Sequence, residues 1–178
     1  MEASGYCRQR VMLHWLSAAV ILWTLLSGFL VAGFEVFAHF KEPVAFFNVS
    51  LTTVFIPFYV WRVFLFITHT RFSGINSRPL LEVLALAAHT LIYLLVGAVL
   101  LTGVLMMDRG INVFWLLEIP QPVSDPQRLA LFVTVHTWLC VVLSLLLVGH
   151  IGAVIVHEAC KHPVLRKMYL RRRREHLE

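Results

Sequence analysis

Apolar residues fill four long runs along the chain, separated by short polar connections. The runs cover about residues 11–34, 46–67, 83–106 and 129–157. Each run is long enough for an α-helix to cross a hydrocarbon core roughly 30 Å thick, which takes about 20 residues. Because four such spans leave almost no residues for a soluble domain, the pattern predicts a single all-α membrane domain over residues 1–178. Its architecture would be a bundle of four transmembrane helices.

Composition and charge agree with a membrane protein. The chain is 59% hydrophobic and 14% charged, which excludes an ordinary soluble domain. Twelve of its 15 Lys and Arg residues lie on the side that holds both termini and the second connection, and the other three are Lys41, Arg109 and Arg128. The positive-inside rule therefore predicts cytoplasmic termini. The net charge of +5 needs no nucleic-acid partner, because Arg171 to Arg174 suit anionic lipid head groups or, alternatively, an acidic partner.

Three histidines mark the fourth apolar run, at positions 136, 150 and 157. The fourteen residues from His136 to His150 rise about 21 Å along a helix. Since a helix drifts only about 20° per heptad, both side chains lie on one stripe, one near each membrane face. His157 extends that stripe by a heptad. Imidazole is a common metal and haem ligand, so the spacing indicates two stacked sites. Alternatively, each histidine hydrogen-bonds a neighbouring helix.

The other runs offer partners for this stripe. His14 in the first run lies at about the depth of His150, so one haem could bridge the two. Gly149 and Gly152 would admit either a flat macrocycle or a close helix neighbour beside His150. His89, near the same membrane face, is a competing ligand or a hydrogen-bond donor to a propionate or a quinone.

Arg62 lies near the cytoplasmic end of the second run. It can either extend to the lipid head groups or pair with a propionate.

The second run and the last connection carry further expectations. Pro57 predicts a kink, with Thr53 placed to satisfy the freed carbonyl. The connection from Asp108 to Arg128 has three prolines and no periodicity, which predicts an irregular cap on the outer face. The three cysteines are too few for a disulfide framework. Without a C-x-x-C-H motif, any haem would be bound non-covalently.

Taken in order along the chain, these residues resemble the bacterial cytochrome b561 family of four-helix membrane proteins. The matching features are His14-Trp15, Arg62, His89-x-x-Ile92-Tyr93, Gly103-Val-Leu-Met-Met107 with Arg109-Gly110, the three histidines of the fourth run, and Leu165-Arg166. The resemblance implies two b haems with paired axial histidines, passing electrons between the periplasm and quinone at the bacterial inner membrane. One branch oxidises superoxide and reduces ubiquinone, so the chain is a possible oxidoreductase.

The family pattern assigns ligands to positions of this chain. The cytoplasmic-side haem would take His14 and His150. The outer haem would take His136 and the residue fourteen positions before Arg62, which is Asn48 here. A carboxamide is a poor ligand for haem iron, so the chain departs from the family at one ligand.

Three outcomes follow from Asn48. The outer haem is absent, leaving one haem b; or it is retained with a substitute ligand; or it is held by His136 alone, with an open coordination position. The substitute ligands to consider are His39, Met106 and Met107. In the family, the region around the third-helix histidine and the histidine seven residues past the last ligand resembles a binding site for a quinone head group. In this chain these residues are His89 and His157.

The leading hypothesis is therefore a haem b electron-transfer protein of the inner membrane with quinone as redox partner. Two alternatives stay open. One is a cytochrome b membrane-anchor subunit that docks a partner redox protein through its outer loop or basic tail. The other is a haem-free helical bundle with a structural or transport role.

Overall fold

Four long helices dominate the computed structural model, which describes residues 8–72 and 80–160. They are α1 (Arg8–Gly33), α2 (Lys41–Phe72), α3 (Leu80–Leu105) and α4 (Pro126–Ala159). Each contains a segment long and apolar enough to cross a membrane, which confirms the predicted all-α membrane bundle. A 3-10 helix, η1 (Glu35–Phe40), joins α1 to α2. Two short strands, β1 (Ile111–Val113) and β2 (Leu117–Ile119), lie between α3 and α4.

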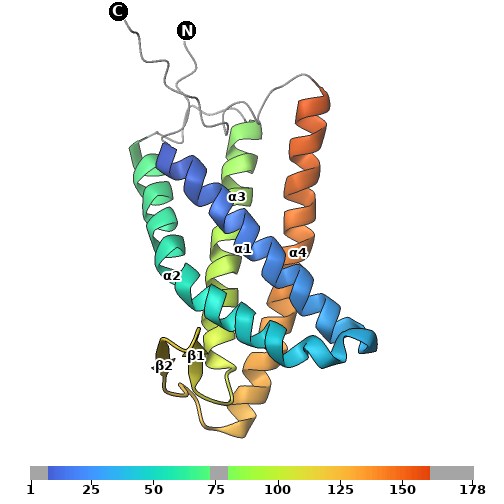
Figure 1. Ribbon diagram of the computed structural model, residues 1–178. Coiled ribbons are helices and arrows are strands. Elements are labelled where there is room, and N and C mark those ends of the chain that lie inside the picture. Colours follow the sequence, from blue (N-terminus) through green and yellow to red (C-terminus); the bar gives the residue numbers. More distant parts are fainter. Residues whose placement is uncertain (1–7, 73–79, 161–178) are drawn as a thin grey trace, which may run out of the picture.

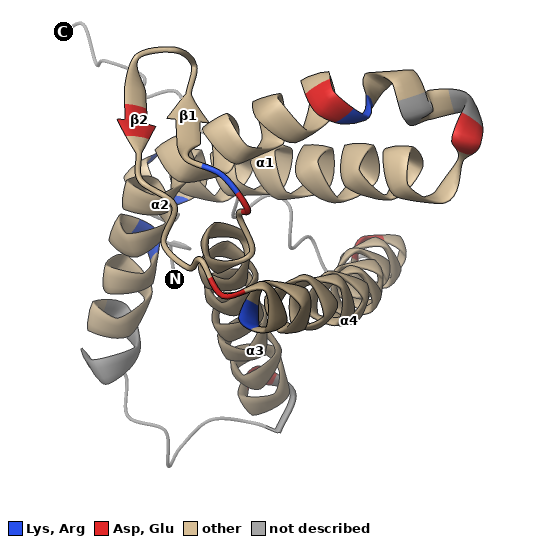
Figure 2. Cartoon of the chain, turned by 90° about the horizontal axis from the view of Figure 1, so that it is seen from below, with Lys and Arg blue, Asp and Glu red and all other residues tan. Residues whose placement is uncertain are grey.

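The helices pack as two close pairs, α1 with α2 and α3 with α4. A small apolar core joins the pairs, with one buried residue from each helix: Val20, Phe55, Val96 and Leu143. We call the end where α1 begins and α4 ends the proximal end, and the end that carries the strands the distal end (Figure 1). Seen from below in Figure 2, α1 and the distal half of α2 run together, apart from α3 and α4.

The helix α2 changes direction about half way along its length (Figure 1). Pro57 lies inside it and lacks an N–H group, so the Thr53 carbonyl loses its helical partner. The sequence predicted that the Thr53 hydroxyl would satisfy the freed carbonyl. It does not, because it donates to the Val49 carbonyl at 2.8 Å. A hydroxyl that bonds one turn back also favours bending, so Thr53 and Pro57 act together.

The connection expected to be irregular instead contains an antiparallel hairpin. Ile111 pairs with Ile119 and Val113 with Leu117, and both β1 residues are buried. Each strand has three residues, too few to show an alternating pattern. This is one reason why the sequence prediction of an irregular cap was wrong.

The turn of the hairpin is a second reason. The Leu116 N–H donates to the Val113 carbonyl at 2.9 Å, and the two central residues, Phe114 and Trp115, have φ angles of 48° and 59°. These values are typical of a type I′ turn, which normally uses Gly, Asn or Asp. A left-handed conformation costs a residue with a side chain roughly 1–2 kcal/mol. The sequence Phe-Trp therefore carries no turn signal.

Ser50 of α2 attaches the hairpin to the bundle. Its hydroxyl is fully buried, donates to the Asn112 carbonyl at 3.1 Å and accepts from the Phe114 N–H at 3.2 Å. Nearby, Arg109 donates to the Glu42 carboxylate at 2.7 Å, and this bond raises the pKa of the guanidinium. Both charged side chains are largely exposed, so the pair contributes little. Ser50 is the stronger attachment.

Replacing Ser50 with alanine should lower the free energy of unfolding by about 1–3 kcal/mol, because two backbone groups of the hairpin lose their partner. Unfolding in mixed SDS micelles would measure the change. Ser144→Ala is the matched control, since that hydroxyl donates to the Cys140 carbonyl of its own helix. It should change stability by less than about 0.5 kcal/mol. Equal losses for both variants would contradict the role of Ser50.

Candidate functional site

Four side chains from four helices form a cluster near the proximal end. They are His14 of α1, Arg62 of α2, His89 of α3 and His150 of α4, and we call them the proximal cluster. The Nδ1 atom of His14 lies 2.9 Å from an Arg62 guanidinium nitrogen, and the rings of His89 and His150 meet edge to face at 5.2 Å between centroids. His14 lies near both other histidines. The residues expected at one depth are thus brought together.

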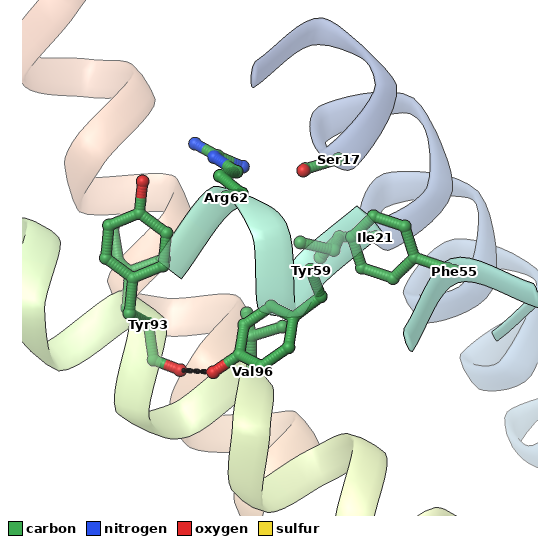
Figure 3. Close-up of a pocket in the computed structure, with 8 residues that line it drawn as sticks. Ser17, Ile21, Phe55, Tyr59, Arg62, Tyr93 and Val96 are labelled. Atoms are coloured by element: carbon green, nitrogen blue, oxygen red, sulfur yellow. Dashed lines mark hydrogen bonds between the residues drawn. The ribbon is translucent and has the colours of Figure 1, made fainter. Parts of the chain in front are cut away.

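Arg62 points into the bundle rather than to the membrane surface. Its guanidinium carbon lies 5.2 Å from the centre of the Tyr93 ring, and it lines a small pocket with Ser17 and Tyr59 (Figure 3). The Tyr59 hydroxyl donates to the Tyr93 carbonyl at 2.7 Å. A Cβ at Gly97 would lie 2.6 Å from that hydroxyl, so glycine at this position leaves room for the end of the Tyr59 side chain beside α3. The pocket measures about 10 Å³, room for one water at most.

The partners of two histidines fix their neutral tautomers. Arginine only donates, so His14 Nδ1 accepts and the ring proton resides on Nε2. His89 Nδ1 lies 2.6 Å from the Ala85 carbonyl, which only accepts, so His89 carries its proton on Nδ1 and keeps a lone pair on Nε2. Coordination of iron through Nε2 of His14 therefore requires the proton to move to Nδ1 and Arg62 to turn to another acceptor.

The proximal cluster has the donor chemistry of a haem site. Neutral imidazoles are its usual axial ligands. At Gly149 and Gly152, on either side of His150, nothing in the described chain lies within 4 Å of where a Cβ would be. A close neighbour within the described chain is therefore not the reason for these glycines, and the space outside the helix at these two positions is open. Within residues 8–72 and 80–160, no three His, Cys, Asp or Glu side chains converge on a single ion site. His157 lies exposed in the last turns of α4.

At the distal end, Asn48 of α2 pairs with Ser27 of α1. The Asn48 amide donates to the Ser27 hydroxyl at 2.9 Å, and the hydroxyl oxygen lies 3.2 Å from the Asn48 side-chain carbonyl. The same hydroxyl also reaches the Trp23 carbonyl at 2.8 Å. The residue at the expected ligand position thus links α1 to α2 by a hydrogen bond.

His136 of α4 pairs instead with α3. Its Nδ1 lies 3.1 Å from the Thr102 hydroxyl, which itself donates to the Ala98 carbonyl at 2.7 Å. Because the Thr102 hydroxyl already donates its proton to Ala98, it accepts a hydrogen bond from the Nδ1–H of His136. Nε2 of His136 therefore keeps the lone pair that could bind iron. Cys140, one turn along, lies 3.5 Å from that nitrogen. A Cβ at Gly103 would lie 3.2 Å from the imidazole, so glycine lets the ring lie against α3.

The candidate substitute ligands lie in different places. His39 is in η1, where its ring packs on Phe40 at 3.8 Å between centroids. Met106 and Met107 follow α3 directly, and the Met106 N–H donates to the Thr102 carbonyl at 2.9 Å. The methionines are therefore one turn beyond the residue that holds His136, whereas His39 belongs to the connection between α1 and α2.

A family model described as prokaryotic cytochrome b561 matches residues 8–170, which is most of the chain. The chain belongs to this family. A comparison with curated proteins gives no match. Prokaryotic cytochromes b561 are membrane proteins that bind b-type haem and transfer electrons, so this chain is a multi-pass membrane protein of that kind. All residues of the proximal cluster lie within the matched region.

Sequence reasoning missed the two hydroxyl partners of the distal end, Ser27 and Thr102. Hydroxyls in membrane helices commonly bond to carbonyls of their own helix, so neither position carried a signal by itself. Gly103 belongs to the cytochrome b561 pattern and lies against the His136 ring. This glycine was the signal for the contact between α3 and His136, and the neighbouring Thr102 supplies the hydrogen bond.

A double-mutant cycle on Ser27→Ala and Asn48→Ala should show that these side chains stabilise the bundle jointly. The expected coupling is about 0.6 kcal/mol, the usual size for a hydrogen bond between membrane helices. Unfolding in mixed SDS micelles would measure it. Pairing Asn48→Ala with Ser144→Ala gives the control cycle, for which we expect no coupling. Additive effects in both cycles would contradict the observed link.

Proposed function

We propose that this cytochrome b561 carries one haem b at its proximal end and exchanges electrons with quinone of the bacterial inner membrane there. One contrast supports the proposal. Near the proximal end, four helices contribute three histidines and an arginine to one cluster, whereas at the distal end Asn48 and His136 bond to hydroxyls of separate helix pairs. Asn48 also lacks the chemistry of an iron ligand.

The proposed axial ligands are His14 and His150. Bound haem supplies reversible one-electron chemistry. Arg62 brings a positive charge into the membrane-spanning part of α2, where a charge is costly unless it has a partner. When His14 takes up its ligand tautomer, the guanidinium is free to pair with a carboxylate such as a propionate.

His89 and His157 are the proposed contacts of the quinone head group. The lone pair on His89 Nε2 can accept a hydrogen bond or a proton from a quinol hydroxyl. His157 is exposed near the end of α4, so a head group there would lie close to the proximal membrane surface. The 10 Å³ pocket below Arg62 is too small for this role.

The charge distribution supports cytoplasmic termini, because the distal side carries three of the 15 basic residues. His136 and His150 are separated by about 21 Å of helix rise. Electron tunnelling slows steeply with distance, so a single proximal haem would exchange electrons on the cytoplasmic side. The superoxide-oxidising chemistry of one family branch, which starts at the outer face, is therefore not our proposal for this chain.

Replacing either His14 or His150 with alanine should abolish the α-band of the reduced low-spin haem, because each variant removes one axial ligand. Optical spectra and a pyridine haemochrome assay of purified protein would measure this. His89→Ala should retain the band, and His157→Ala is the control on the same helix as His150. An unchanged band in the His150 variant, or its loss in the His89 variant alone, would contradict the ligand assignment.

The purified protein should contain about one haem b per polypeptide. Asn48→His restores an imidazole at the ligand position that the family pattern pairs with His136, and should raise the ratio toward two. Asn48→Gln should leave it unchanged, because a carboxamide is retained. A ratio near two in the unmodified protein would contradict the one-haem proposal and direct attention to Met106, Met107 and His39.

A further inference from the structure

The tip of the distal hairpin carries highly exposed apolar side chains. We define the tip as Trp115, Leu116 and Leu117, whose exposed fractions are 79%, 89% and 57%. Leu116 and Trp115 are the two most exposed large apolar residues in the described segments. Exposure of three adjacent apolar side chains to water is unfavourable, so we expect this surface to lie in an apolar environment.

The tip is held in place rather than left loose. The turn is closed by the hydrogen bond between Leu116 and Val113, and the Trp115 N–H donates to the Asn112 side chain at 2.8 Å. The ring of Phe46 on α2 packs against the Trp115 ring at 4.4 Å between centroids. With the hairpin also fixed to Ser50, the structure maintains a strained turn that keeps these side chains outward.

The apolar surface of the tip continues into the lipid-facing surface of α2. Phe114 contacts Phe47 of α2 at 5.9 Å between ring centroids, and Phe47 is 41% exposed. Val54 and Phe58 follow it at intervals of seven and four residues, on the same helix face, and are exposed to a similar degree. All three lie in the membrane-spanning part of α2. Figures 1 and 2 both place the hairpin beside α2 at the edge of the molecule.

Charged residues lie at the base of the hairpin and not at its tip. The segment Val113 to Leu117 contains none, while the Arg109–Glu42 ion pair lies just before β1. Glu118 approaches Gly110 near the base, with its carboxylate 3.3 Å from a Cβ built there. A polar base and a tip with an amphipathic tryptophan match the two sides of a membrane interface.

We propose that the tip of the distal hairpin inserts into the interfacial region of the distal membrane leaflet, with lipid as its partner. Trp115 lies at head-group level, and Leu116 and Leu117 contact the upper acyl chains. The hairpin thereby fixes the depth of the distal half of α2 in the membrane. The proposal depends on the bundle spanning a membrane and not on its haem content.

Site-directed spin labelling of the full chain in phosphatidylcholine and phosphatidylglycerol vesicles tests this proposal. The three native cysteines are replaced by alanine, and one label is placed by Leu116→Cys. Ser124→Cys, an exposed position in the same distal connection, is the matched control. Collision rates with oxygen, which is enriched in lipid, and with a water-soluble nickel chelate on both sides report the depth of each label. Circular dichroism confirms that both labelled proteins are folded.

We expect the ratio of oxygen to nickel collisions to be several-fold higher at position 116 than at position 124. Equal ratios with free access of nickel would place the tip in water and overturn the proposal. A motionally restricted label that is shielded from both reagents would show that protein covers the tip, either a second copy or a redox partner. That result would also overturn it.

Discussion

A bilayer core offers no water, so every polar group inside this bundle has to find its partner in the protein. Within residues 8–72 and 80–160, no buried side-chain nitrogen or oxygen lacks a hydrogen bond. Most hydroxyls meet the requirement locally, as Ser17 does with the Leu13 carbonyl. The remaining polar side chains reach across to another element, and these few links decide which helix faces turn inward.

The links differ between the two ends of the molecule. Near the proximal end, Arg62 contacts both His14 and Tyr93, so one guanidinium joins three helices. At the distal end, one link joins α1 to α2 and another joins α3 to α4. A planar cofactor between helix pairs needs ligands that face each other across the bundle. The proximal end brings histidines from both helix pairs into one cluster, while the distal hydrogen bonds strengthen each pair separately.

Long-range periodicity made much of the fold predictable from the sequence. The four runs located the helices, and the fourteen-residue spacing correctly indicated that His136 and His150 share a face, because both contact α3. The resemblance to the cytochrome b561 family, which expects a histidine fourteen residues before Arg62, also identified Asn48 as the unusual residue. The inward direction of Arg62 was not predictable, since its long side chain can reach either the head groups or a neighbour. The partners of Asn48 and His136 depend on helix packing, which no local pattern encodes.

The hairpin shows a different limit, and it bears on how the protein assembles. Its strands are short and its turn is unfavourable for Phe114 and Trp115, so the local sequence does not form it alone. Contacts with Ser50 and Phe46 of α2 compensate for the unfavourable turn. Ser50 precedes the hairpin groups that it binds by more than 60 positions. Contacts between such distant parts of the chain cost more loop-closure entropy than local contacts do. We therefore expect the hairpin to be completed late in folding, after α2 has packed in the bundle.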